Sequence, residues 1–137
     1  MTASATGGCL CGAVRYSVDG AVGPAGYCHC TDCRRVTGSA FNISAPVRLA
    51  DLAVTGDLRS HAHPAESGTI LTRHFCATCG SPIYAASPAH PDIVYVRAGT
   101  LDDPDLVRPA LEAWCGSRVA WSVIPQGLQQ TEKGRFA

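Results

Sequence analysis

The sequence predicts a mostly β protein with a single domain, built from short strands and turns and containing little helix. It has 14 glycines and 9 prolines among 137 residues, a composition that favours turns over long helices. Several segments alternate apolar and polar residues, which is typical of strands with one covered face. A chain of this size buries about two-thirds of its unfolded surface. We therefore expect one core for residues 1–137.

The strand pattern recurs along most of the chain. In order, it covers residues 13–18, 39–47, 49–55, 69–75, 81–85 and 92–97. A further short strand is expected to lead into the motif that begins at Tyr27. Pro46 has no backbone N–H, so it predicts an edge position or the end of its strand. The C-x-x-C-G motif at residues 76–80 is typical of a metal-binding turn at a strand end.

The remaining segments have weaker patterns. Residues 34–38 are too few to predict a helix, and residues 60–68 are polar and turn-rich, which predicts a surface loop. Residues 106–114 fit either a short strand or a helical turn. We expect Trp121 to pack on the core and residues 126–137 to form a loosely held tail, because this tail has little apolar material to bury.

Charges are balanced, with 11 Lys and Arg against 11 Asp and Glu, so no global field attracts nucleic acid or an anionic membrane. The first eight residues contain neither a basic residue nor an apolar signal core. No apolar run is long enough to span a bilayer. We therefore expect a cytoplasmic protein with no nucleic-acid partner and no membrane partner.

Eight cysteines in so short a chain need an explanation. Without an export signal they indicate metal binding, whereas a disulfide framework is the alternative for a secreted protein. Seven of them form a C-x-C, a C-x-C-x-x-C and a C-x-x-C cluster, made by Cys9 and Cys11, by Cys28, Cys30 and Cys33, and by Cys76 and Cys79. The eighth, Cys115, lies beside Trp114 and is expected to be a small buried apolar residue.

These clusters can be combined in more than one way. The two pairs together supply the four ligands of a closed structural zinc site, which leaves the triple cluster with an open fourth position. Alternatively, Cys76 and Cys79 close a site with two members of the triple cluster, and spacing alone prefers neither arrangement. An iron–sulfur cluster is also compatible with the number of cysteines.

The chemistry of a triple cluster favours a sulfur-containing substrate. Zinc with three thiolates has a net charge of minus one, so it is a poor generator of hydroxide. A soft site of this kind is better suited to an external thiol, which it deprotonates and holds as a nucleophile.

Four motifs in order, GCLCG at 8–12, CHCTDCR at 28–34, FCATCG at 75–80 and GTLDDP at 99–104, resemble the glutathione-dependent formaldehyde-activating enzyme family, which is also related to centromere protein V. The resemblance covers about residues 7–125. It implies a zinc-bearing, mostly antiparallel β-tent fold. It also implies a structural zinc on Cys9, Cys11, Cys76 and Cys79 and a catalytic zinc on Cys28, Cys30 and Cys33.

The family reaction joins formaldehyde to glutathione, giving S-hydroxymethylglutathione, and is classed with carbon–sulfur lyases. The resemblance thus implies a small-molecule thiol such as glutathione as the partner. Next to the triple cluster, His29 or Asp32 is a candidate for proton transfer, and Arg34 or Arg35 for pairing with a substrate carboxylate. Strand alternation can equally turn His29 away from the metal.

Two other functions use the same residues. A zinc-stabilised module that binds a partner protein needs the cysteines but no catalysis. A thiol redox sensor would release zinc when Cys28, Cys30 and Cys33 are oxidised.

Overall fold

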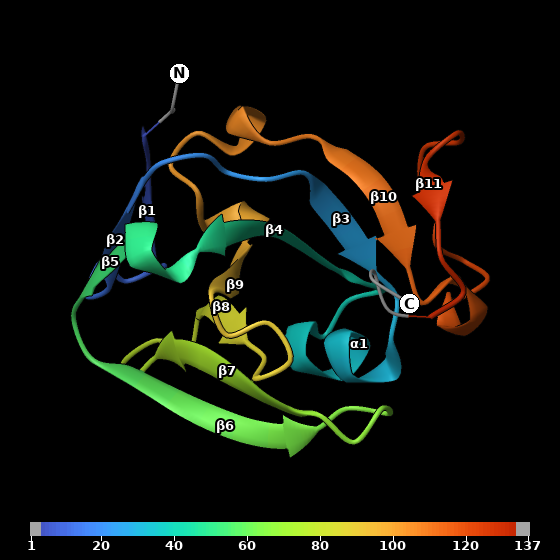
Figure 1. The fold of residues 1–137 in the computed structure, drawn as a ribbon, viewed down its shortest axis with the longest axis horizontal. Helices are drawn as coiled ribbons and strands as arrows, with labels where there is room; N and C mark the ends of the chain where they lie inside the picture. Colours follow the sequence, from blue (N-terminus) through green and yellow to red (C-terminus); the bar gives the residue numbers. More distant parts are fainter. Residues whose placement is uncertain (1–3, 134–137) are drawn as a thin grey trace.

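The computed structural model describes residues 4–133, which form two β-sheets (Figure 1). The smaller sheet has the order β1-β2-β5 and the larger has the order β11-β10-β3-β4-β9-β8-β7-β6. The strand bounds are β1 Ser4–Gly8, β2 Arg15–Asp19, β3 Ala25–Cys28, β4 Asn42–Arg48, β5 Leu52–Thr55, β6 Leu58–Pro64, β7 Ile70–Cys76, β8 Pro82–Ala86, β9 Ile93–Arg97, β10 Pro109–Ala113 and β11 Gln129–Gln130. The prediction of a mostly β protein is confirmed.

The larger sheet curves around the interior of the molecule. In Figure 1, β10, β3 and β4 form its upper part, β7 and β6 its lower part, and β8 and β9 connect the two. The helix α1, Thr31–Thr37, lies beside the ends of these layers. Short 3₁₀ turns occupy Leu49–Asp51, Ala98–Thr100, Pro104–Leu106 and Cys115–Ser117. Within residues 4–133, no helix is both long enough and apolar enough to cross a membrane.

Alternating side chains from both sheets build the core. Tyr16 and Val18 point inward from β2, and Val94 and Val96 do so from β9. Cys76 at the end of β7 is only 1% exposed and belongs to the same packed cluster. Burial of apolar surface stabilises this arrangement by roughly 25 cal/mol per Å². A predicted metal ligand at one end of the larger sheet is thus itself part of the core.

Residues 31–37 form a helix, which the sequence did not predict. The extended residue Cys30 caps its start, because Cys30 Sγ accepts a hydrogen bond of 3.2 Å from the backbone N–H of Cys33. Gly38, with φ of 66°, ends the helix in the left-handed conformation that glycine adopts without strain. A seven-residue helix is too short to leave a clear periodic signal.

Residues 60–64 belong to strand β6, so the predicted loop over residues 60–68 is wrong in its first half. β6 pairs in register with β7 from Leu58 opposite Cys76 to Pro64 opposite Ile70. It is the last strand of the sheet and almost wholly exposed, so it needs no apolar residues, and polar edge strands resist aggregation. The turn itself is limited to residues 65–69.

Pro46 lies inside the larger sheet, in β4 opposite Tyr95 of β9. The pairing of β4 with β3 stops at Ser44, so no residue of β3 pairs with Pro46. A backbone N–H at position 46 is therefore not needed on that side of β4. The proline therefore occupies a locally unpaired side of an interior strand. Its carbonyl oxygen instead accepts a hydrogen bond of 2.8 Å from the N–H of Gly23.

The C-terminal segment differs from prediction in two respects. Trp121 is 72% exposed and does not pack on the core. Gln129–Gln130 form β11, which pairs with β10, so part of the predicted loose tail is ordered, while residues 134–137 lie outside the described range. β10 is parallel to both β3 and β11, an exception to the otherwise antiparallel pairing.

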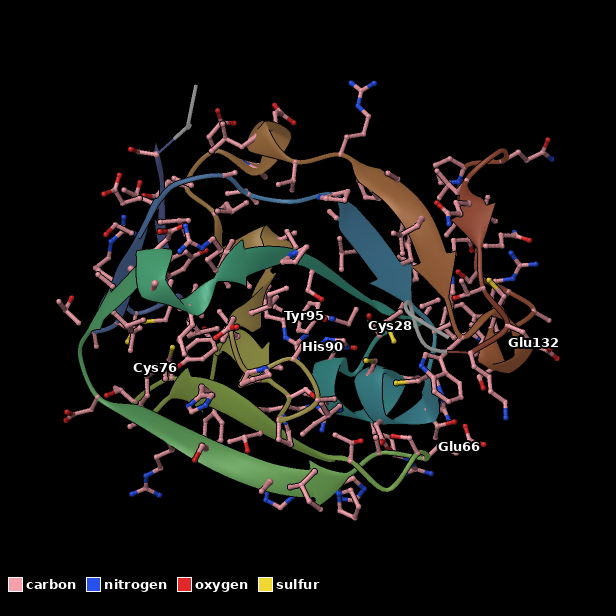
Figure 2. The ribbon with its side chains drawn as sticks, viewed as in Figure 1. Cys28, Glu66, Cys76, His90, Tyr95 and Glu132 are labelled. Atoms are coloured by element: carbon pink, nitrogen blue, oxygen red, sulfur yellow. The ribbon has the colours of Figure 1, made fainter. Side chains whose placement is uncertain are left out.

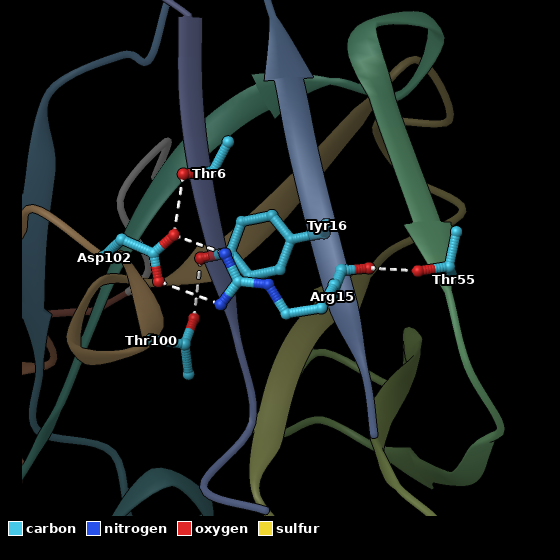
Figure 3. Close-up of polar contacts among 6 residues, drawn as sticks. All are labelled: Thr6, Arg15, Tyr16, Thr55, Thr100 and Asp102. Carbon is cyan, nitrogen blue, oxygen red and sulfur yellow. Dashed lines mark hydrogen bonds and ion pairs between the residues drawn. The ribbon is translucent and has the colours of Figure 1, made fainter. Parts of the chain in front are cut away.

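The GTLDDP motif closes the smaller sheet (Figure 3). Asp102 forms an ion pair with Arg15 of β2 and accepts a hydrogen bond of 2.7 Å from Thr6 of β1. The backbone N–H of Asp102 also donates to the carbonyl oxygen of Thr6 at 2.9 Å. One carboxylate thus joins two strands to the segment after β9.

A second contact from the same motif reaches β9 through Thr100, whose contact with Tyr16 is drawn in Figure 3. The hydroxyl of Thr100 donates to the backbone oxygen of Arg97 at 2.7 Å, so the Tyr16 hydroxyl, 2.8 Å away, is the donor to Thr100. The motif therefore holds the end of β9, where Arg97 lies, against the small sheet.

Candidate metal centres and the adjoining cavity

Cys9, Cys11, Cys76 and Cys79 come together at one end of the molecule, and all their sulfur atoms lie within 4.8 Å of one another. Cys11 Sγ lies 3.6 Å from Cys9 Sγ and 3.8 Å from Cys76 Sγ. Four sulfurs placed tetrahedrally at about 2.3 Å from zinc would be about 3.8 Å apart. The donor set and its spacing therefore fit one closed metal site.

Hydrogen bonds favour the thiolate form, which is the form that binds metal, at two of these four sulfurs. The N–H of Val14 donates to Cys9 Sγ at 3.2 Å and lowers the pKa of Cys9. Ser81 Oγ lies 3.1 Å from Cys79 Sγ, and this contact is the main cause that lowers the pKa of Cys79 to about 5. Ser81 Oγ also accepts a bond of 3.1 Å from the N–H of Leu10, which links the two cysteine turns.

Cys28, Cys30 and Cys33 form the second cluster, again with all sulfurs within 4.8 Å of one another. Cys28 ends β3, Cys30 caps α1 and Cys33 lies in its first turn. The strand-to-helix transition therefore folds three nearby residues around one point. Hydrogen bonds from the thiols of Cys28 and Cys33 lower the pKa of Cys30, whereas the contact with Cys30 raises that of Cys28. One thiolate is thus stabilised by two neighbouring thiols.

A cavity of about 630 Å³ adjoins this triple cluster, and Cys28 and Cys33 are part of its wall. Its volume lies within the range of about 300–1,000 Å³ that is usual for small-molecule sites. Figure 2 shows Cys28, His90 and Tyr95 on the same side of the interior, with Cys76 at the opposite end. A metal held by three thiolates here would have its free position next to the cavity. The triple cluster therefore fits an open site.

All eight cysteines lie within the described residues 4–133 and are free thiols, so this part of the chain contains no disulfide framework. Cys115 is partly exposed rather than buried, and its Sγ lies 3.8 Å from the carbonyl oxygen of Glu112. Burial is the main cause that raises its pKa, which disfavours a reactive thiolate.

The sequence of residues 4–117 matches the family model described as glutathione-dependent formaldehyde-activating enzyme. The chain belongs to this family. The resemblance stated from the motifs is thereby confirmed.

Two individual proteins are similar to this member of the family. One, from Halomonas elongata, is provisionally named a glutathione-dependent formaldehyde-activating enzyme; it is 34% identical over 113 residues, which cover 75% of this chain and 68% of that protein. The other is a crystal structure of a Rhodobacter sphaeroides protein, which is 27% identical and covers 76% of this chain and 96% of its own. Its TM-score of 0.59 indicates a shared fold.

In this family member, two arginines outside the cysteine motifs, Arg73 and Arg97, also line the cavity. Arg73 of β7 is 7% exposed, and Arg97 of β9 is partly exposed. Burial is the main cause that lowers the pKa of Arg97, and the nearby Cys33 thiol opposes this shift. An arginine within a strand that has a covered face is a sequence signal for a functional residue. Only the strand pairing decides whether two such arginines lie in the same cavity.

The four non-cysteine residues proposed from the sequence lie elsewhere. His29 is completely buried, and its Nε2 lies 3.0 Å from Glu112 Oε1. Asp32 Oδ1 lies 3.9 Å from His63 Nε2. Arg34 is partly exposed and Arg35 is exposed. None of the four belongs to the cavity wall.

Proposed function

We propose that this protein joins formaldehyde to the thiol of glutathione, forming S-hydroxymethylglutathione, and thus acts as a carbon–sulfur lyase. The observation that carries this proposal is the position of Cys28 and Cys33 in the wall of a cavity of about 630 Å³. The description of the family supports glutathione and formaldehyde as the reactants. Eight free cysteines suit a reducing compartment such as the cytoplasm.

The proposal includes one structural and one catalytic zinc. Zinc held by Cys28, Cys30 and Cys33 would deprotonate a substrate thiol and hold its sulfur as a nucleophile. The donor set fits this role, since the three sulfurs lie within 4.8 Å of one another and two of these cysteines face the cavity. The four-cysteine cluster has the complete ligand number of a structural site.

The reaction itself needs positioning and one proton. The substrate sulfur attacks the carbon of formaldehyde, a carbon–sulfur bond forms, and the carbonyl electron pair moves to the oxygen, which takes up a proton. A cavity that holds both reactants removes much of the entropic cost of their encounter. His90 lines the cavity, and we assign the delivery of this proton to its imidazole in place of His29 or Asp32.

The cavity also supports an enzyme over a protein-binding module. A zinc-stabilised module presents a surface to its partner and needs no enclosed space beside its metal ligands. Here side chains from β3, β4, β7, β8 and β9 form part of the cavity wall, which gives this part rigid support. Rigid elements of this kind favour precise placement of a small substrate.

The test compares rates of adduct formation. Carbon-13 formaldehyde is mixed with glutathione, and exchange between free formaldehyde and the adduct is measured by NMR with and without zinc-loaded protein. We expect exchange above the uncatalysed rate for the parent and for Cys115→Ser, whose thiol lies outside both clusters. Cys28→Ser should return the rate to background while circular dichroism stays unchanged. A zinc-loaded parent that does not exceed background would refute the proposed activity.

A further inference from the structure

Arg73 and Arg97 lie on the same face of the larger sheet, on either side of β8. Arg73 is directly opposite Ala85 of β8, and Ala85 is directly opposite Tyr95 of β9, two residues before Arg97. Directly paired residues project to the same face of a sheet, as do residues two apart on one strand. The small side chain of Ala85 leaves space between the arginines, and this space is part of the cavity.

Neither guanidinium is paired with a carboxylate of the described residues 4–133. The ion pairs found within residues 4–133 involve neither Arg73 nor Arg97. The Nε atoms of both arginines are buried and make no hydrogen bond. A buried cation and a buried unpaired donor both cost free energy unless a partner is supplied. The two guanidiniums are therefore suited to bind an anion that comes from outside the folded chain.

The neighbouring charges do not fill this gap. A divalent metal with three thiolates has a net charge of minus one, whereas the two guanidiniums have a charge of plus two. At the cavity wall, Lys133 adds a positive charge and Glu66 a negative one, both on exposed side chains. At least one positive charge next to the triple cluster is therefore uncompensated until a ligand binds.

We propose that Arg73 and Arg97 bind a carboxylate of the substrate, so that the protein selects thiols that carry a carboxylate. This inference rests on the proposed function, because it takes a thiol as the ligand of the same cavity. It transfers the carboxylate-binding role from Arg34 and Arg35, which lie outside the cavity wall, to two arginines within it. Guanidinium is suited to this role because its donors form paired hydrogen bonds with a carboxylate.

The experiment uses two thiols of equal chain length, 3-mercaptopropionate and 3-mercaptopropan-1-ol, which differ in a carboxylate and a hydroxyl. Dissociation constants are measured by calorimetry on zinc-loaded protein at fixed pH and ionic strength. We expect the parent to bind 3-mercaptopropionate about 10- to 100-fold more tightly, the range for hydrogen bonds to a charged group. This preference should fall to less than about threefold in Arg97→Gln and in Arg73→Gln.

Matched control variants distinguish the effect of an arginine in the cavity wall from the effect of the protein's overall charge on thiol binding. Arg34→Gln and Arg35→Gln remove the same charge outside the cavity wall and should keep the preference. Zinc content and thermal unfolding are recorded for every variant, because Arg73 is 7% exposed and its loss can affect folding. If Arg73→Gln does not fold, the partly exposed Arg97→Gln and the charge-retaining Arg97→Lys decide the question.

The outcomes of the binding and exchange experiments are distinct. Equal affinity of the parent for both thiols, binding of neither thiol, or a preference that survives every folded cavity-arginine variant would overturn the carboxylate site. A preference that depends on the arginines, together with no acceleration of adduct formation, would support the site and refute the proposed activity. Acceleration without any preference would refute the carboxylate site alone.

Discussion

The imidazole of His29 and the carboxylate of Glu112 meet inside the protein, with His29 Nε2 3.0 Å from Glu112 Oε1 and the side chains 0% and 1% exposed. Glu112 Oε2 accepts a further bond of 3.0 Å from Gln130 Nε2. Because His29 lies between Cys28 and Cys30, this contact anchors the backbone of the triple cluster to β10 and β11.

Removing this carboxylate should destabilise the fold. In Glu112→Ala, the fully buried His29 loses its partner, and we expect a loss of about 1–3 kcal/mol in the free energy of unfolding. Chemical denaturation at constant zinc content measures it. The exposed Glu132→Ala should change the value by less than about 0.5 kcal/mol. Equal stability of the two variants would contradict a structural role for the buried pair.

The two cysteine clusters should respond differently to mutation. Cys76 is 1% exposed and joins the core to the N-terminal turn, so Cys76→Ser should largely unfold the chain. Cys30→Ser should stay folded, lose one of two zinc ions and lose activity, because the open cluster lies beside the cavity. Zinc analysis and thermal unfolding of both variants provide the comparison. Similar losses of melting temperature would argue against separate structural and catalytic sites.

Ser81 should strengthen metal binding at the four-cysteine cluster without touching the metal. Its hydroxyl links Leu10 N–H to Cys79 Sγ, and loss of such outer contacts typically costs 10–100-fold in metal affinity. We expect this decrease for Ser81→Ala in a competition with a chromophoric chelator. Ser60→Ala, on the exposed strand β6, is the control and should leave the affinity unchanged. An unaltered metal affinity in Ser81→Ala would show that Ser81 does not contribute to metal binding.

The contribution of Asp102 should be constant above about pH 4. The hydrogen bond from Arg15, followed by that from Thr6, lowers the pKa of Asp102 from 3.8 to about 2. A carboxyl group whose pKa is lower in the folded than in the unfolded chain stabilises the fold at pH values above the unfolded pKa. This stability is lost as the pH falls through about 2. Asp102→Asn should therefore shift the urea midpoint downward equally at pH 8 and pH 6. A shift that shrinks between these values, or one matched by the exposed Asp105→Asn, would contradict this assignment.

His90 should matter for the rate and not for zinc. If its imidazole moves the proton of the new hydroxyl, His90→Gln should lower kcat/KM by about 100-fold or more at unchanged zinc content. His29→Gln and Asp32→Asn test the two residues that the sequence suggested, and we expect smaller effects because neither lines the cavity. A larger loss in His29→Gln with intact folding would return the proton transfer to His29.

The cysteine motifs and most of the strands could be predicted because they are local patterns. The turn of Cys76 and Cys79 needs only its own residues and Gly80, whose φ of 79° is one that glycine adopts freely. The strand alternation of Tyr16 and Val18 follows equally from nearest neighbours. The chain by itself therefore determined its class, its family and which cysteines belong to which motif.

The tertiary structure decided what depends on register and partners. β6 is a strand because β7 pairs with it, although its own residues are polar. The joining of the N-terminal cysteine pair to Cys76 and Cys79 depends on a contact over more than sixty residues of chain. Arg73 and Arg97 share one cavity only because β8 places a small alanine between their strands. Contacts between distant segments are set by the packing of whole sheets, which no local pattern of residues encodes.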